Sequence, residues 1–419
     1  MIRRLTTGRR SFAVASLSVA TLCLMIATPG VSSAGPAPSP SSINVAMKLR
    51  AGTDVNTVAS RLGLSDVQPI LRSRRLYRAS VALGGKDAAD PRKAIEQVKR
   101  DQSVEYAESA DTGGTQGERF YAWVEGRSDY VGTDPAAWQR QPAMALVGGY
   151  QAQQRTRGAG VVVAVLDTGI DSTHPSLAGR MIGGYDYVDD DADPADVGNG
   201  IDDDGNGVVD HAVGHGTFVS GVVGLVAPDA KIWVGRVLDS EGRGTAPAIA
   251  EAIRDATAAG VGVINMSFGT NTKLQSPALD AAIREARAAG IVIVAAAGND
   301  ASPSGFYPAA ASGVMSVGAV RSDARTLSLF SNFGKWVDVA APGERIVSTT
   351  PGGTFSAWSG TSAAAPFVAG QAALLRSINT RDRADKIIET IRTTSRKLDK
   401  PFENLLGAGV IDIPASLAK

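Results

Sequence analysis

The chain has 419 residues, enough for two or three domains and for a hydrophobic core of good size. Its 42 basic and 42 acidic residues give a formal net charge of zero, so the overall charge provides no case for binding to nucleic acid or to an anionic membrane. Apolar residues make up 44% of the chain and aromatic residues 5%, a composition that suits closely packed layers of helix and sheet rather than a disordered chain.

The first 34 residues have the parts of an export signal. A basic head with four arginines precedes an apolar run over residues 12–27, and Ser32-Ser33-Ala34 forms a small-residue cleavage site. The head contains Arg9-Arg10-Ser11-Phe12, which resembles a twin-arginine motif, so the export route stays open between the general and the twin-arginine pathway. The only cysteine, Cys23, lies in the apolar run, and the mature chain therefore has no disulfide. We expect an exported protein, extracellular or periplasmic, with no membrane anchor.

Residues 35–110 begin with a proline-rich linker and continue as a compact pattern of strands and helices. We predict strands over residues 43–49, 67–71, 76–83 and 104–107, and helices over residues 53–62 and 91–100. The order β-α-β-β-α-β is that of a ferredoxin-like α+β domain. Residues 43–109 carry 12 basic and 8 acidic residues, which suits docking on an acidic partner. An independent small binding domain is the alternative.

Residues 111–135 are glycine-rich and irregular, and from Gly160 onward apolar runs alternate with amphipathic segments. The predicted strands cover residues 161–166, 232–237, 262–266, 291–295 and 314–320. The predicted helices cover residues 217–225, 246–259, 279–289 and 384–393. Unbroken apolar strands that alternate with helices indicate a parallel sheet covered on both faces, and hence an α/β domain.

Three short motifs carry the chemistry of the chain. Asp167 lies at the end of an apolar strand in residues 163–171, His215 lies in Gly214–Thr217, and Ser362 lies in Gly360–Pro366 at the start of an apolar helix. Taken singly, a strand-end aspartate is usually a turn residue, and Gly-Thr-Ser is an ordinary helix N-cap. Together they supply what nucleophilic acyl transfer needs: a hydroxyl nucleophile, an imidazole base, and a carboxylate that orients the base.

These motifs resemble those of the subtilisin-like serine proteases (subtilases, peptidase S8 family), in which the catalytic residues follow the same order. The resemblance covers roughly residues 135–419, and a looser resemblance over residues 43–109 is to the inhibitor-I9-like propeptide of the family. It implies a doubly wound parallel sheet with helices on both faces, preceded by a small ferredoxin-like propeptide. We therefore divide the chain into a signal peptide (1–34), a propeptide (35–110), a linker and maturation region (111–135) and a catalytic domain (136–419).

The resemblance also implies an oxyanion donor and substrate-binding strands. Asn299 matches the residue whose side-chain amide binds the tetrahedral oxyanion in this family. Two short segments match the strands that flank the substrate cleft, namely Gly242, Arg243 and Gly244, and Ser267, Phe268 and Gly269. Phe306, next to Tyr307-Pro308, stands where some members have glycine. We expect its ring to fill the first specificity pocket and to favour small residues before the scissile bond.

An aspartate-rich segment precedes His215: residues 186–210 contain ten aspartates and no lysine or arginine. The candidate calcium ligands in it follow the early positions of an EF-hand loop, and they are Asp202, Asp204, Asn206 and Asp210. Val213 stands where the closing glutamate of such a loop belongs. Because this many carboxylates repel one another without a cation, we predict structural Ca²⁺. A solvated acidic loop and a docking surface for the basic propeptide are the alternatives.

We therefore predict a secreted serine endopeptidase, made as a zymogen that processes itself and hydrolyses peptide bonds through an acyl-enzyme on Ser362. Its expected partners are protein or peptide substrates and its own propeptide, which acts as an intramolecular inhibitor. We expect a monomer that binds no nucleic acid. Two other classes stay open. One is a catalytically silent relative that only binds peptides in the cleft, and the other is a metallohydrolase that uses His211, His215 and Asp210 as ligands.

Overall fold

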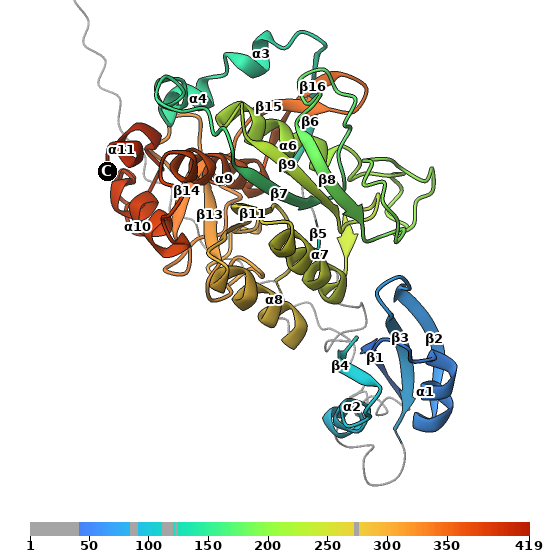
Figure 1. The fold of residues 1–419 in the computed structure, drawn as a ribbon. Coiled ribbons are helices and arrows are strands. Elements are labelled where there is room, and N and C mark those ends of the chain that lie inside the picture. Colours follow the sequence, from blue (N-terminus) through green and yellow to red (C-terminus); the bar gives the residue numbers. More distant parts are fainter. Residues whose placement is uncertain (1–41, 84–90, 111–119, 122–124, 272–275) are drawn as a thin grey trace, which may run out of the picture. The chain divides into compact units, whose positions relative to one another are not determined.

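The computed structural model describes residues 42–83, 91–110, 120–121, 125–271 and 276–419, all within one compact unit, Pro40–Lys419 (Figure 1). The predicted signal peptide lies outside the described residues, as do residues 111–119 and 122–124 of the predicted maturation region. None of the helices in the described ranges is long and apolar enough to cross a membrane.

The N-terminal part of the described chain is a small α+β domain. Its elements are β1 (Ser42–Leu49), α1 (Val55–Leu62), β2 (Leu64–Leu71), β3 (Leu76–Ala82), α2 (Pro91–Lys99) and β4 (Val104–Ser109). The strands form an antiparallel sheet in the order β2-β3-β1-β4, which is the ferredoxin-like arrangement that the sequence predicts. Val45, Met47 and Leu49 of β1 alternate along the strand and pack with Val58 of α1 and Val98 of α2, which makes β1 the centre of this core.

The larger part of the chain is built on a seven-stranded sheet. Its strands are β7 (Val162–Asp167), β8 (Met181–Asp186), β9 (Lys231–Arg236), β11 (Val263–Met266), β12 (Val292–Ala296), β13 (Met315–Val320) and β14 (Val339–Pro342). Their order is β14-β13-β12-β11-β7-β9-β8, and every neighbouring pair is parallel. The strand order reverses direction at β7, as in a doubly wound sheet, and this confirms the predicted fold class.

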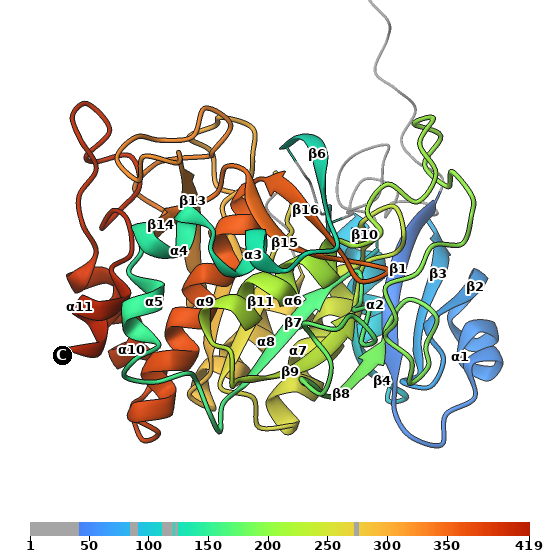
Figure 2. The same cartoon turned by 90° about the horizontal axis from the view of Figure 1, so that it is seen from above.

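Helices cover both faces of this sheet (Figures 1 and 2). The four large ones are α6 (His215–Val226), α7 (Ala246–Ala258), α8 (Pro277–Ala288) and α9 (Thr361–Ile378). Val163 and Val165 of β7 pack with residues of α6 and α9, whereas Ala164 and Leu166 pack with residues of α7 and α8. The alternation along one strand therefore buries both faces, which explains why the strand reads as an unbroken apolar run.

Smaller elements surround the main sheet. The helices are α3 (Ala136–Gln139), α4 (Pro142–Leu146), α5 (Gly149–Ala152), α10 (Ala384–Thr394) and α11 (Ile413–Leu417). A second sheet contains β15 (Ile346–Thr350), β16 (Thr354–Ser359) and β6 (Glu125–Gly132) in the order β15-β16-β6. The short strands β5 (Phe120–Tyr121) and β10 (Arg243–Gly244) form an antiparallel pair of their own.

Candidate active site

Asp167 and His215 form the buried centre of the site. Asp167 is the last residue of β7, at the point where β11 lies on one side of the strand and β9 on the other, which is where open α/β sheets bind ligands. Nδ1 of His215, the first residue of α6, lies 2.7 Å from Oδ1 of Asp167, and each side chain is 1% exposed. Because the carboxylate accepts the proton of Nδ1, the lone pair of the neutral ring is at Nε2, where it can take up a proton.

Ser362 lies in the first turn of α9, which packs against α6. Ser362 is 5% exposed, and the three residues that follow it, Ala363–Ala365, are small. The Ser267 hydroxyl donates to the backbone oxygen of Ser362 at 2.9 Å, and the Asn265 amide donates to the Ser267 hydroxyl at 2.9 Å. These two bonds hold the start of α9 against the end of β11, so the serine sits at the positive end of the helix dipole.

Asn299 is oriented by the residue before Ser362. Its Oδ1 accepts hydrogen bonds from the backbone N–H of Thr361 at 2.8 Å and from the Thr361 hydroxyl at 2.9 Å. The Thr361 hydroxyl also accepts the N–H of Gly298 at 3.0 Å. A backbone N–H requires an acceptor, so the oxygen end of the carboxamide faces Thr361 and the amide nitrogen lies at the opposite end. Asn299 and Ser362 line the same cavity, as an oxyanion donor requires.

This cavity has a volume of about 320 Å³, and its lining includes Ser267, Phe268, Gly269, Asn299, Phe306 and Ser362. The Phe306 ring lies between two stretches of backbone. A methyl group on Gly269 would fall 2.2 Å from a ring carbon of Phe306, and one on Gly298 would fall 2.7 Å from another. The ring therefore occupies space between the two walls of the cavity that only glycine at both positions leaves open.

The other predicted substrate strand, Gly242–Gly244, is paired with a segment of the chain itself. Arg243 and Gly244 of β10 lie opposite Tyr121 and Phe120 of β5 in antiparallel register. Because β5 belongs to the predicted maturation region, the strand that we expect to bind extended substrate pairs with a segment on the N-terminal side of the catalytic domain.

Three of the four predicted calcium ligands lie in one turn, where the backbone N–H of Asn206 donates to Asp202 at 3.1 Å and to Asp204 at 3.0 Å, whereas Asp210 has other partners. Asp202 accepts the N–H groups of Gly205 and Gly207, and the bond from Gly207 lowers the pKa of Asp202. The carboxylate of Asp210 instead accepts the N–H groups of Asn199 and Gly200 at 3.0 and 2.9 Å. Asn206 accepts the N–H of Val208 through Oδ1 at 2.7 Å.

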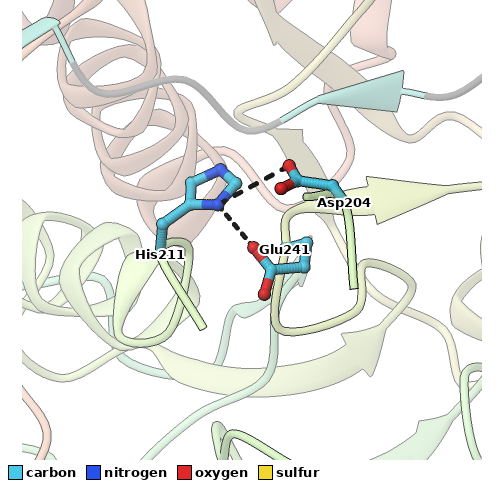
Figure 3. Close-up of side chains that lie close together, drawn as sticks. All are labelled: Asp204, His211 and Glu241. Atoms are coloured by element: carbon cyan, nitrogen blue, oxygen red, sulfur yellow. Dashed lines mark hydrogen bonds and ion pairs between the residues drawn. The ribbon is translucent and has the colours of Figure 1, made fainter. Parts of the chain in front are cut away.

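Asp204 also lies close to His211 and Glu241, as Figure 3 shows. Nδ1 of His211 lies 2.6 Å from Oε2 of the buried Glu241 and 3.9 Å from Oδ2 of Asp204. Asp204, His211 and Glu241 form the one group of three histidine and acidic side chains, within the described ranges, whose ligand atoms lie close enough together to share a metal ion. His215 and Asp210 are not part of it, so the metallohydrolase alternative loses the ligand set that it requires.

The N-terminal domain contacts the face of the larger domain that carries α7 and α8. The guanidinium of Arg74 pairs with both carboxylate oxygens of Asp255 at 3.2 and 2.6 Å. Lys48 forms an ion pair with Glu251. Glu108 accepts the Ser276 hydroxyl at 2.9 Å and the N–H of Ala278 at 3.1 Å, at the N-terminus of α8. Basic residues of the predicted propeptide therefore meet acidic residues of helix α7, and the backbone N–H of Ser73 donates to Asp190 of the acidic segment at 2.7 Å.

Three residues of the site were not predicted from the sequence. They are Thr361, which orients Asn299, and Asp196 and Thr168, which hydrogen-bond each other. Thr361 and Thr168 are neighbours in sequence of predicted catalytic residues, so the motifs contained them without a role. Asp196 is one of the ten aspartates of residues 186–210, and nothing in the sequence separates it from the others.

The arrangement of a buried Asp–His pair, an adjacent helix with a serine in its first turn, and a doubly wound parallel sheet defines a serine hydrolase of the α/β class. The subtilase family model matches residues 158–409. Thermitase of Thermoactinomyces vulgaris is 38% identical over 272 residues, which cover 64% of this chain and 93% of thermitase. Subtilisin NAT of Bacillus subtilis subsp. natto is 34% identical over 337 residues, 77% of this chain and 78% of that protein. The chain belongs to the subtilase family, whose members are serine endopeptidases.

Two further proteins are similar to this chain, one over only part of its length and one in fold. A thermophilic serine proteinase of Bacillus sp. (strain AK1) is 46% identical over 223 residues, but the match spans only 53% of this chain and 54% of that protein. The crystal structure of fervidolysin from Fervidobacterium pennivorans, described as a keratinolytic enzyme related to subtilisin, superposes with a TM-score of 0.69 at 23% identity. That superposition covers 90% of this chain and 61% of fervidolysin, and it shows a likeness of fold.

Proposed function

We propose that the chain is the exported precursor of a serine endopeptidase that hydrolyses peptide bonds through an acyl-enzyme on Ser362. The observation that carries this proposal is the buried 2.7 Å hydrogen bond between His215 and Asp167, on a helix that packs against the helix of Ser362. A carboxylate-oriented imidazole is the base that a serine hydroxyl needs in order to act as a nucleophile. Apolar lining of the cavity suits the side chain of a peptide substrate better than a polar small molecule.

In the proposed reaction the hydroxyl oxygen of Ser362 attacks the substrate carbonyl carbon while Nε2 of His215 takes the hydroxyl proton. The Asn299 amide and the backbone N–H of Ser362 then donate to the oxyanion. The C–N bond breaks as His215 returns the proton to the leaving amine, and water releases the acyl group by the same two steps. Nε2 makes no hydrogen bond to any described residue, and such contacts tighten when substrate binds.

The decisive experiment compares the wild-type chain with Ser362→Ala. We expect the wild type to shorten to the size of the catalytic domain and to digest an unstructured protein such as casein, and the variant to do neither. If both chains mature alike and neither digests casein, the cleft is a peptide-binding site without catalysis. Chelator treatment separates the metallohydrolase alternative, because a metal-dependent reaction stops at once, whereas an enzyme that needs calcium only for stability loses activity slowly as it unfolds.

We also propose that residues 35–110 act as an intramolecular inhibitor that is removed by the enzyme itself. The contacts at Arg74, Lys48 and Glu108 support a docked propeptide, and the pairing of β5 with β10 supports entry of the maturation region into the cleft as an extended strand. A chain held there would be cut at a bond that follows Tyr121 in the sequence. N-terminal sequencing of the mature enzyme tests this placement, and a mature chain that still begins before Phe120 contradicts it.

A structural Ca²⁺ remains a proposal for the acidic loop. Asp202, Asp204 and Asn206 offer oxygen ligands from one turn, and the carboxylate of Glu241 lies close to Asp204, so it is a better closing ligand than Asp210. We expect added Ca²⁺ to raise the melting temperature of the wild type and to leave Asp204→Ala unchanged. Equal melting temperatures of the wild type with Ca²⁺ and with chelator would favour the solvated-loop alternative.

The proposed location, oligomeric state and substrates of the mature enzyme rest on the sequence analysis. The mature enzyme would act outside the cytoplasm, in the periplasm or the medium, as a monomer with protein or peptide substrates. Fractionation of cells that express the full chain tests export, and light scattering of the matured enzyme tests the monomeric state.

A further inference from the structure

Asp196 is a buried carboxylate that the proposed reaction does not use. It lies between β8 and α6, is 4% exposed, and accepts four hydrogen bonds. Its Oδ1 accepts the N–H of Gly214 at 2.9 Å and the hydroxyl of Thr168 at 3.0 Å. Its Oδ2 accepts the N–H of Thr217 at 3.0 Å and the hydroxyl of the same residue at 2.6 Å. All four donors are neutral, so these bonds have to replace the hydration of the carboxylate.

The four donors come from the two segments that carry the Asp–His pair. Gly214 is the N-cap residue of α6 and Thr217 lies in the first turn, on either side of His215, and Thr168 follows Asp167 directly. The Thr168 hydroxyl, which donates to Asp196, also accepts the N–H of Gly216 at 2.8 Å. Gly214, the N-cap of α6, has no side chain to satisfy the first N–H groups of the helix. Asp196 therefore takes the place of an N-cap side chain from outside the helix.

The two segments are also in direct contact. A methyl group on Gly216 would lie 2.2 Å from the backbone oxygen of Gly169, so the first turn of α6 approaches the turn after β7 as closely as glycine allows. A small movement of α6 changes the distance between Nδ1 of His215 and Oδ1 of Asp167, because each atom belongs to one of the two segments.

We propose that Asp196 is a positioning residue of the site: its carboxylate ties the first turn of α6, which carries His215, to the turn that follows Asp167. The inference rests on the proposed function, since it assigns Asp196 a part in catalysis by His215 and Ser362. Burial is the largest influence on this carboxyl and raises the pKa of Asp196, whereas the hydrogen bonds from Thr217 and Gly214 oppose burial.

The first test is Asp196→Asn in the full chain, assayed after maturation. An amide presents an NH₂ group to donors that need acceptors, so the first turn of α6 loses part of its attachment. We expect kcat per active site to fall on the order of tenfold to a hundredfold, the size expected when catalytic groups are misplaced by about 1 Å, with KM changed less than about twofold. Titration of active sites with a serine-directed phosphonylating reagent counts the competent enzyme, so a loss of folded protein alone does not lower kcat per site.

A second pair of variants keeps the test decisive if Asp196→Asn does not fold. Thr168→Val removes the bridging hydroxyl with little change of shape, and Thr168→Ser retains it. We expect the valine variant to lose kcat per site and the serine variant to stay within about threefold of the wild type. Asp186→Asn is the matched control, because Asp186 is another buried carboxylate but pairs with Arg236. It should lower stability and leave kcat per site unchanged.

The results separate the inference from the proposed function. Unchanged kcat per site in Asp196→Asn and Thr168→Val overturns the inference, as does a rise of KM at constant kcat, which indicates a role in substrate binding instead. A wild-type chain that forms no titratable sites and behaves like Ser362→Ala overturns the proposed function itself.

Discussion

At the scale of single residues, the side chain of Asn299 is held by a neighbour in the orientation that the proposed oxyanion role requires. Two hydrogen bonds from Thr361 fix its oxygen end, so no rotation is needed when charge develops on the substrate. We expect Asn299→Ala to lower kcat on the order of a hundred- to a thousandfold with little change of KM, the size found for the matching donor of subtilisin. Thr361→Val, which keeps the backbone bond, should cost less. Steady-state kinetics with active-site titration measures both, and equal losses would mean that the hydroxyl orients Asn299 by itself.

Phe306 sets the second prediction at this scale. Because its ring contacts the backbone at Gly269 and Gly298, a substrate side chain that enters beside Ser362 meets the ring. We expect the wild type to cleave a peptide with alanine before the scissile bond faster than the matched peptide with phenylalanine. Phe306→Gly should reverse that order, since it opens the pocket. A wild type that cleaves best after phenylalanine or leucine contradicts the role assigned to Phe306.

At the scale of elements, strand β4 and helix α8 are joined by hydrogen bonds to a titratable carboxyl group, that of Glu108. Glu108 caps the N-terminus of α8 through Ser276 and Ala278, and burial raises the pKa of Glu108 above its usual value of 4.5. In a detached propeptide the carboxyl faces water and has the lower pKa. The docked state therefore takes up the proton first, so docking tightens as pH falls through the raised pKa and levels off below 4.5.

The inhibition constant of the propeptide, measured against the mature enzyme from neutral to mildly acidic pH, tests this linkage. We expect inhibition by the wild-type propeptide to strengthen toward acidic pH. Glu108→Gln keeps an acceptor but does not titrate, so its curve should lack this contribution. Parallel curves for the two propeptides would assign the pH dependence to other groups.

At the scale of the whole molecule, the zero net charge conceals two complementary surfaces. Arg74 of the N-terminal domain pairs with Asp255 of α7 through both oxygens, and its guanidinium lies 5.1 Å from the centre of the Tyr185 ring. A bidentate pair of this kind depends on orientation as well as charge. A partly exposed ion pair adds little binding energy, but this one helps to determine which surface the N-terminal domain binds.

Charge reversal tests this surface. Arg74→Glu should weaken propeptide inhibition about tenfold, because it places like charges together, and Asp255→Arg should do the same. The double variant should recover most of the loss. Reversal of the exposed Arg157–Asp229 pair, which lies within the catalytic domain, is the control and should leave inhibition unchanged. Failure of the double variant to recover would show that the two residues do not act as a pair.

Most of the architecture could be predicted from the sequence, because buried positions appear in it as apolar residues at the period of a helix or strand. Apolar runs and amphipathic segments predicted β7, β9, β11, β12 and β13 and the helices between them to within a few residues. Two strands of the same sheet were missed. Met181–Asp186 contains two glycines and an exposed isoleucine, and only its last residue is buried, whereas Val339–Pro342 is short and ends in proline. The first has no continuous apolar run to detect, and the second is an apolar run of only four residues.

Asp167, His215, Ser362 and Asn299 are predicted from sequence because each is marked by its immediate neighbours in the chain. Asp196 could not be predicted in this way, since its role depends on donors from Thr168 and Thr217, which only the folded sheet brings to it. The same holds for Glu241 beside His211 and for β5 beside β10. Local sequence determines which faces are buried and which motifs exist. The partner of a buried carboxylate, however, is decided by tertiary structure, because its hydrogen-bond donors come from segments far apart in the chain.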